Sequence, residues 1–304
     1  MPIRIPDDLP GRPTLEEEGV RVMDRSTAIR QDIRPLRIGL LNLMPNRVET
    51  EVQFARLLGA SPLQIELTLV RLAAHQPTDR SRPHLDAFYR DWDELKDEKF
   101  DGFLITGAPL GMVPYEEITY WEELKTLLDW TETHVFAPLF VCWGAMAALH
   151  HFHGIAKEKL EEKASGVFPH TNHDITSPWL AGLGQEVPMP VSRWTTIPSA
   201  SIEASDKLRM LLSSEATGAG LIEEPATRRL YMLNHLEYEA ESLKEEYERD
   251  LAKGEPAKVP VNYFDGDDSK ARPRHRWKPH GHLFYAGWVN EIYQAVPFDW
   301  TETT

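Results

Sequence analysis

The chain has 304 residues, of which 41% are hydrophobic and 27% are charged, a composition typical of a soluble globular protein. The formal net charge of −15 argues against nucleic acid or an anionic membrane as the main partner, and no apolar run reaches the ~18 residues of a membrane helix. The single cysteine, Cys142, rules out a disulfide framework within the chain, and the N-terminal residues lack an apolar signal core, so we expect a cytoplasmic protein.

Residues 1–34 are polar and rich in proline, so we expect an N-terminal arm with one short strand, followed by a single α/β domain over residues 35–304. In the first half of that domain, apolar runs predict strands at residues 36–43, 63–69, 103–106 and 139–141. Helical spacing predicts helices at residues 47–58, 85–95, 121–128 and 143–154, with Gly59 as the C-cap of the first. The alternation predicts a mostly parallel sheet, which binds ligands at the carboxyl ends of its strands.

The second half of the domain has a looser pattern. Shorter strands, partly antiparallel, are predicted at residues 166–168, 187–194, 208–212 and 220–222, and a core strand at 230–233. Leu243, Tyr247 and Leu251 are spaced by four residues and predict a charged helix. A long loop over residues 254–281 leads to a last amphipathic helix from Leu283 to Ile292, and we find no internal repeat and no domain linker.

Cys142 follows directly on the predicted strand 139–141 and begins the next helix. This pattern is typical of a nucleophile elbow, and a helix N-terminus favours the thiolate. Gly144 is present two residues later, but Phe140 stands where such elbows have glycine, so we expect a less sharp turn. Taken alone, the stretch favours a small buried cysteine without a catalytic role.

His235 and Glu237 lie just past the predicted strand 230–233, two residues apart. In extended backbone such residues point to the same side, so the carboxylate can orient and polarise the imidazole. The loops 44–47, 107–111 and 142–143 also follow strands and are expected to face one crevice. The pattern favours a nucleophile, a base and a base-orienting group at neighbouring strand ends.

Other motifs carry weaker signals. The histidines of residues 150–153 lack an acidic or cysteine partner at ligand spacing, so we expect no metal site. The partial G-x-G of residues 218–220 leads into a strand and does not indicate dinucleotide binding. The basic run at residues 272–278 is interpreted as a solvated loop, with a patch for coenzyme phosphates as the alternative.

These residues together resemble the homoserine O-acyltransferases of methionine biosynthesis, a family with a flavodoxin-like α/β fold of the class I glutamine amidotransferase type. The resemblance covers almost the whole chain. Its motifs are Leu41-Asn42-Leu43-Met44-Pro45 with Thr50-Glu51, Thr106-Gly107-Ala108-Pro109, Val141-Cys142-Trp143, His235-Leu236-Glu237-Tyr238 and Asn262-Tyr263-Phe264.

The resemblance implies a ping-pong transfer of an acyl group from acyl-CoA to the γ-hydroxyl of L-homoserine, in a homodimer without a cofactor. It implies Cys142 as the acyl-carrying nucleophile, His235 as general base and Glu237 as its orienting partner. Contacts to the amino-acid substrate are implied for Lys163, Ser192 and Arg249. Backbone N–H groups of Trp143 and of the loop 107–111, with Leu110 among them, are the expected oxyanion donors.

Gly111 matches the position that separates acyl donors in the family. Members with Gly there resemble succinyl-CoA users and members with Glu resemble acetyl-CoA users, so the resemblance implies succinyl-CoA. Asn234 and the segments 143–146 and 192–194 look closer to members with Glu, and acetyl-CoA therefore remains the alternative donor. Arg47 stands where the family commonly has Lys, which keeps the charge.

Two other classes of function use the same residues. A glutamine amidotransferase would use the same cysteine, histidine and glutamate to release ammonia, but the sequence supplies no synthetase domain. A non-catalytic binding protein of this fold would have no need of an intact Cys142, His235 and Glu237.

Overall fold

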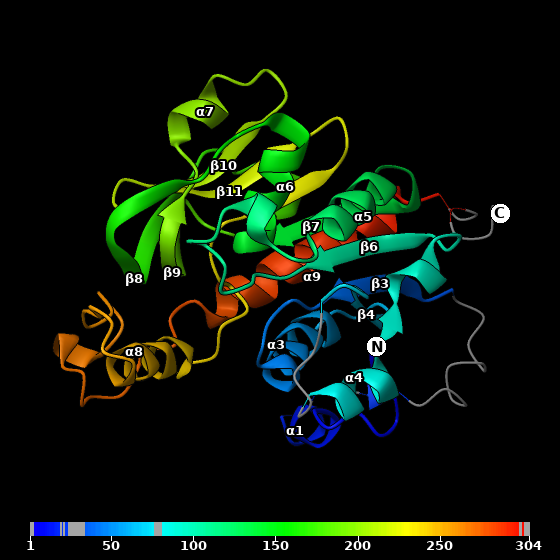
Figure 1. Cartoon of the computed structure of the whole chain (residues 1–304), viewed down its shortest axis with the longest axis horizontal. Helices are drawn as coiled ribbons and strands as arrows, with labels where there is room; N and C mark the ends of the chain where they lie inside the picture. The colour runs from blue at the N-terminus through cyan, green and yellow to red at the C-terminus, as the bar shows by residue number, and fades with distance from the viewer. Residues whose placement is uncertain are drawn as a thin grey trace.

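The computed structural model describes residues 3–18, 20, 22–23, 34–75, 81–297 and 300. The twelve strands within them form one sheet of order β2-β1-β4-β3-β6-β7-β12-β11-β10-β8-β9, and β5 pairs with β4. Helices pack against both faces of this sheet (Figure 1). The predicted α/β class with a mostly parallel central sheet is confirmed.

The central strands run parallel, in the order β4-β3-β6-β7-β12. They are β3 (Leu36–Leu41), β4 (Ile65–Arg71), β6 (Phe100–Ile105), β7 (Val135–Val141) and β12 (Arg229–Met232). Every residue of β6 and β7 is buried, because helices cover both faces, and this explains their almost unbroken apolar sequences.

The hydrophobic core has two parts, one on each face of the sheet. The first packs beneath α1 (Arg12–Glu17), α3 (Arg47–Gly59) and α9 (Lys278–Ala295), and the second beneath α5 (Trp121–His134) and α6 (Trp143–His153). Gly102 of β6 admits α9, since a Cβ there would lie 2.7 Å from the ring of the fully buried Trp288. The predicted closing helix is therefore part of the core.

The C-terminal half of the sheet is antiparallel, as predicted, but β8 (Glu158–Asn172) is much longer than the strand expected at residues 166–168. β8 pairs with β9 (Glu186–Thr196) on one side and with β10 (Arg209–Ser214) on the other, β10 pairs with β11 (Gly218–Glu224), and α7 (Ser199–Glu203) follows β9. The first residues of β8 are largely exposed and charged, so they show no apolar alternation by which sequence could reveal a strand.

Two local predictions were wrong. The helix expected at residues 85–95 is divided into α4 (Arg82–Phe88), β5 (Arg90–Asp91) and a 3₁₀ turn (Trp92–Leu95), because Tyr89 is extended. Its hydroxyl donates to Glu51 Oε1 of α3 at 2.5 Å. Gly59 is the last helical residue rather than the C-cap, and a Cβ there would lie 2.5 Å from Val20, so Gly59 serves close packing.

Two short strands, β1 near one end and β5 near the other, pair with the outer edge of β4. The described part of the N-terminal arm contains β1 (Ile3–Arg4), which pairs with Ile65 and Glu66, and β2 (Val22–Met23), which pairs with β1. At the other end of β4, β5 pairs with Val70 and Arg71. The arm therefore holds one strand more than expected, while its residues 24–33 lie outside the described part of the chain.

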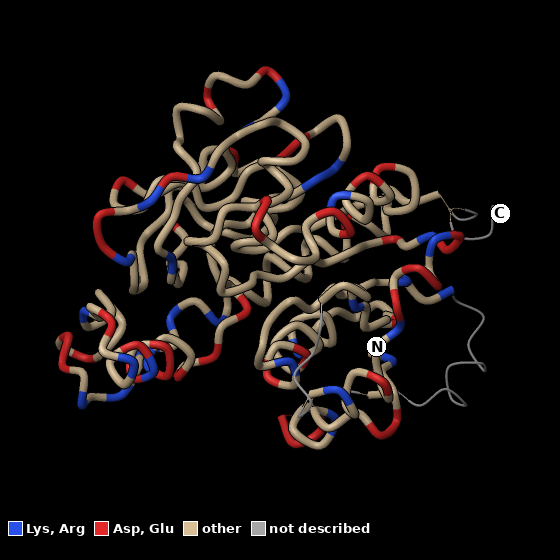
Figure 2. The backbone as a smooth tube through the Cα atoms, viewed as in Figure 1, with Lys and Arg blue, Asp and Glu red and all other residues tan. Residues whose placement is uncertain are grey.

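The charged helix predicted from the spacing of Leu243, Tyr247 and Leu251 is α8 (Ser242–Ala252). In Figure 1 it lies below the ends of β8 and β9, and Figure 2 shows acidic and basic residues crowded around it. None of the helices in the described residues has both the length and the hydrophobicity needed to cross a bilayer.

Candidate active site

Cys142 occupies a sharp turn between β7 and α6. Its backbone has φ 51° and ψ −117°, a conformation that residues other than glycine rarely adopt. The Cys142 N–H donates to the Met232 carbonyl of β12 at 2.7 Å, which ties the turn to the neighbouring strand. The expectation of a less sharp turn was wrong: Phe140 stays within β7, fully buried and stacked on Tyr231, and Cys142 itself takes the strained conformation.

Close packing brings the strand ends together at this turn. A Cβ on Gly144 would lie 2.6 Å from the Thr106 carbonyl oxygen, so α6 reaches the end of β6 only with glycine at that position. A Cβ on Gly107 would lie 3.2 Å from Cys142 Cβ. The Leu43 N–H donates to Thr106 Oγ1 at 2.8 Å and brings in the loop after β3. The predicted convergence of the three strand-end loops is confirmed.

His235 and Glu237 follow β12, the strand next to β7, and both are buried. His235 Nδ1 lies 2.6 Å from Glu237 Oε1, and the imidazole stacks on the Tyr238 ring with centroids 4.0 Å apart. The backbone N–H of His235 donates to the Pro190 carbonyl of β9 at 3.0 Å. Because Glu237 engages Nδ1, Nε2 is the nitrogen left for the thiol of Cys142.

The charges around His235 favour its protonated form. Burial acts to lower the pKa of His235, but the charge of Cys142, the charge of Glu237 and hydrogen bonds to both raise it well above its ordinary value. A protonated imidazole beside a thiol stabilises the thiolate.

Arg193 of β9 is a buried cation behind the nucleophile, and sequence reasoning missed its importance. Burial, only partly offset by the charge of Cys142, lowers the pKa of Arg193 to about 10. Its guanidinium donates to the carbonyls of Leu233 at 3.2 Å and Thr217 at 2.6 Å and to Asn234 Oδ1, while its buried Nε has no partner in the described structure. It forms no ion pair with a carboxylate of the described residues.

A neutral histidine holds the other side of Asn234. Asn234 Nδ2 lies 2.8 Å from His170 Nε2, and His170 Nδ1 lies 2.9 Å from the Phe168 carbonyl oxygen. Burial is the main reason that the pKa of His170 is lowered to about 4, so it stays neutral with its proton on Nδ1. This chain of hydrogen bonds positions Arg193 and the segment that carries His235.

The three residues expected to contact an amino-acid substrate gather around α8. Lys163 of β8 donates to Glu246 Oε2 at 3.3 Å and to Asp250 Oδ2 at 2.5 Å, and Ser192 of β9 donates to Glu246. Arg249 is half-exposed and contacts Asp250 at 3.1 Å. Glu246, which sequence reasoning did not single out, is their common partner.

Glu246 also joins this cluster to the histidine. The Tyr238 hydroxyl donates to Glu246 Oε1 at 2.6 Å, and the Tyr238 ring is the one that stacks on His235. The carboxylate of Glu246 thus lies one aromatic ring away from the imidazole. The only sequence signal was that Glu246 lies one helical turn before Arg249 and Asp250 on α8.

The two expected oxyanion donors differ in their surroundings. Trp143 is the first residue of α6, where a backbone N–H has no partner within the helix. The Leu110 N–H donates to the Ala108 carbonyl at 2.8 Å and is already engaged. Gly111 follows, and a Cβ there would lie 3.1 Å from Thr195 Oγ1. Trp143 is therefore the better placed donor.

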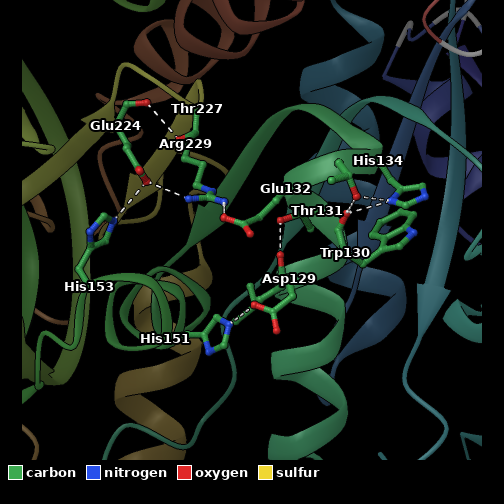
Figure 3. A network of polar contacts seen from close by, with 12 residues as sticks. Asp129, Trp130, Thr131, Glu132, His134, His151, His153, Glu224, Thr227 and Arg229 are labelled. Atoms are coloured by element: carbon green, nitrogen blue, oxygen red, sulfur yellow. Dashed lines mark hydrogen bonds and ion pairs between the residues drawn. The ribbon is translucent and has the colours of Figure 1, made fainter.

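The histidines at the far end of α6 have structural partners (Figure 3). His151 Nε2 lies 2.6 Å from Asp129, and His153 Nε2 lies 3.2 Å from Glu224. His150 stacks on Tyr115, with ring centroids 4.5 Å apart. The described residues contain no group of three or more side chains placed to hold a metal ion.

Sequence comparison places this chain beside a set of known acyltransferases. The family model described as homoserine O-succinyltransferase matches residues 2–298. A homoserine O-acetyltransferase of Chelativorans sp. is 54% identical over 299 residues, which cover 98% of this chain and 96% of the relative. A homoserine O-acetyltransferase of Hyphomonas neptunium is 54% identical over 302 residues, which cover 99% of both chains.

Solved structures share the fold at much lower identity. A glutamine amidotransferase of Thermotoga maritima has a TM-score of 0.57 at 10% identity and covers 86% of this chain and 99% of its own. A glutamine amidotransferase of Methylobacillus flagellatus has a TM-score of 0.53 at 12% identity and covers 85% of this chain and 95% of its own. At these identities the likeness shows the fold alone.

Proposed function

The chain belongs to the homoserine O-succinyltransferase family, and from this we propose that it transfers an acyl group from acyl-CoA to the γ-hydroxyl of L-homoserine. The observation that carries the proposal is the alignment of Cys142, His235 and Glu237 at adjacent strand ends, with 2.6 Å between His235 Nδ1 and Glu237 Oε1. Cys142 carries the acyl group as a thioester, His235 moves the proton, and Glu237 holds the imidazole.

The first half-reaction exchanges one thioester for another. The Cys142 thiolate attacks the thioester carbonyl of acyl-CoA, and the N–H of Trp143 stabilises the oxyanion that forms. The bond to the CoA sulfur breaks, and protonated His235 gives its Nε2 proton to that sulfur. The acyl group stays activated because it remains a thioester.

The second half-reaction returns the proton. Neutral His235 accepts the proton of the homoserine γ-hydroxyl as that oxygen attacks the acyl-Cys142 carbonyl. The carbon–sulfur bond then breaks, which leaves the thiolate beside a protonated imidazole, as at the start. Glu237 stabilises the imidazolium in both halves.

Charges around α8 suit a zwitterionic amino acid. Arg249 is half-exposed and offers a guanidinium fork to the carboxylate of homoserine. The carboxylate of Glu246 suits the ammonium group of homoserine, and Lys163 and Ser192 hold the Glu246 carboxylate in place. A free amino acid would then be oriented at both ends, with its hydroxyl directed toward His235.

Succinyl-CoA is our proposed donor, with acetyl-CoA as the alternative. Position 111 has little space for a side chain, since an added Cβ would already lie 3.1 Å from Thr195 Oγ1. A glutamate there would crowd this space and repel a succinyl carboxylate. From family membership the proposal extends to a role in methionine biosynthesis, to a cytoplasmic location and to a homodimer. The mass of the protein in solution checks the homodimer.

Intact mass spectrometry tests the chemistry. The protein is incubated with succinyl-CoA and with acetyl-CoA, and we expect one acyl adduct, absent from the Cys142→Ala variant and discharged by L-homoserine but not by L-serine. Absence of an adduct with either donor, together with no homoserine-dependent release of CoA, would overturn the proposal. Formation of glutamate from glutamine would instead support an amidotransferase.

A further inference from the structure

Lys157, which no step of the proposed mechanism uses, reaches the loop that carries Gly111. It lies between the end of α6 and the start of β8, and its side chain is partly buried. Its Nζ donates to the Val113 carbonyl at 2.6 Å and to the Leu110 carbonyl at 3.3 Å. These two carbonyls stand on either side of Gly111. The ammonium is therefore fixed against the backbone on both sides of Gly111, the residue at the proposed acyl-donor position.

Lys157 forms no ion pair within the described part of the chain. Its polar partners are two neutral carbonyls and the face of Tyr115, whose ring centroid lies 4.4 Å from Nζ. Burial lowers the pKa of Lys157 to about 8, and the negative charge of Glu116 offsets this only in part. An ammonium has three N–H donors, so one remains for a further acceptor.

The loop that Lys157 holds borders the nucleophile at its start, because a Cβ built on Gly107 would lie 3.2 Å from Cys142 Cβ. Met146 is one helical turn after Cys142, its Sδ lies 3.5 Å from Thr195 Oγ1, and the same Oγ1 is the atom closest to a Cβ built on Gly111. The two carboxyl carbons of an extended succinyl group are roughly 4 Å apart, given C–C bonds of ~1.5 Å, so its second carboxylate would stand clear of the Cys142 sulfur.

We propose that the Lys157 ammonium binds the distal carboxylate of a dicarboxylic acyl donor, and thereby makes the chain select a succinyl-type group over an acetyl group. The inference rests on the proposed acyltransferase function and deepens it. Gly111 keeps this place empty, because a carboxylate side chain at position 111 would lie beside the same ammonium. Donor choice then depends on which carboxylate neutralises Lys157, as well as on the space at residue 111.

The test measures kcat/KM for succinyl-CoA and for acetyl-CoA in the wild type, Lys157→Met and Lys157→Arg, with the exposed Lys159→Met as matched control. We expect Lys157→Met to lower the succinyl-to-acetyl ratio about ten- to a hundredfold, the usual effect of removing a charged hydrogen bond. Lys157→Arg should retain most of the ratio, and Lys159→Met should leave it as in the wild type.

Gly111→Glu gives an independent check. It should lower the same ratio when Lys157 is present and have a much smaller effect in the Lys157→Met background, since the two changes act on one interaction. Intact mass of each variant with succinyl-CoA and with acetyl-CoA separates the two hypotheses. A wild type that forms no adduct with either donor overturns the proposed function. Normal acetylation with an unchanged ratio in Lys157→Met, or a wild type that does not accept succinyl-CoA, overturns the role of Lys157 alone.

Discussion

The two ends of α6 both carry buried charged side chains, but only at one end are the polar atoms of the carboxylate and guanidinium groups fully paired within the described structure. At the last turn of α6, Glu224 accepts hydrogen bonds from Arg229 at 3.1 Å and His153 at 3.2 Å (Figure 3). It also accepts one from the Tyr231 hydroxyl at 2.9 Å. Arg229 also pairs with Glu132 at 2.6 Å. None of these side chains has a buried polar atom without a partner in the described structure.

At the first turn of α6 the pairing is incomplete. Glu237 Oε2 and Arg193 Nε are both buried with no hydrogen-bond partner among the described residues. Leaving such a group unpaired costs about 1–3 kcal/mol. Both networks are supported by β11, β12 and α6, so the supporting elements do not explain why only one network is fully paired. A closed network stabilises the fold, whereas an open one keeps charge available for a reaction.

The largest expected effect is on the open network. Glu237→Gln should lower kcat/KM about 10⁴-fold, because an amide can neither stabilise the imidazolium of His235 nor select its tautomer. The melting temperature should stay the same or rise, since the variant removes a buried, half-paired carboxylate. Steady-state kinetics and thermal unfolding of one preparation check both statements; a large loss of stability would mean that Glu237 is chiefly structural.

The reverse pattern is expected at the closed network. Glu224→Gln should lower the free energy of unfolding by about 3–5 kcal/mol, because it breaks a buried ion pair on one side only. Activity per folded molecule should persist. Urea denaturation together with kinetics at low temperature measures the two quantities, and equal losses in Glu224→Gln and Glu237→Gln would erase the distinction between the two ends.

The same carboxylate gives this end a pH signature. Burial opposes ionisation of Glu224, but its bonds to His153, Tyr231 and Arg229 prevail and lower its pKa to about 2. Its contribution to stability is therefore complete above the unfolded value of 4.5 and is lost as the pH falls from there toward 2. In Glu224→Gln, the free energy of unfolding should change less with pH over this range. The difference in the free energy of unfolding between wild type and variant should vanish near pH 2.

A smaller effect is expected from the buried cation beside the nucleophile. Arg193→Met should slow alkylation of Cys142 by iodoacetamide at pH 7 about ten- to a hundredfold, since a nearby positive charge favours the thiolate. The pH profile of alkylation should move to higher pH, and Arg193→Lys should restore part of the shift. A slower reaction with an unmoved profile would show that Arg193 only supports packing.

The smallest effect concerns the exposed rim of the closed network. Glu132 is half-exposed, although its partner Arg229 is buried. Glu132→Ala should cost less than about 1 kcal/mol in the free energy of unfolding, because solvent screens the pair. Denaturation beside Glu224→Gln gives the comparison. A loss as large as that of Glu224→Gln would show that Arg229 depends on both carboxylates equally.

Sequence reasoning reached the parts of the site that lie at the ends of regular apolar strands. Cys142 and His235 stand directly after such strands, and the rule that parallel strands end on one edge brought them together. Glu237 followed from its spacing to His235. The parallel half of the fold was predictable for the same reason, because buried strands have a continuous apolar sequence.

The remaining parts were hidden because they depend on long-range pairing of charged segments. Glu246 lies on a helix that reads as solvated, and its role appears only once α8 meets β8 and β9. Lys157 precedes a charged strand, and its contact with Val113 joins two loops far apart in sequence. Arg193 looked like a flank of Ser192, although it is buried. No local period encodes such contacts.

The short strands that cover β4 have a consequence for handling this protein. β1 and β5 pair with the two ends of β4, and between them no other strand of the described residues lies on that outer side. Removing residues 3–4 by truncation would expose the backbone of β4 as a template for strand addition by a second chain. Such a shortened protein would lose activity through aggregation, although all of its proposed catalytic residues would still be present.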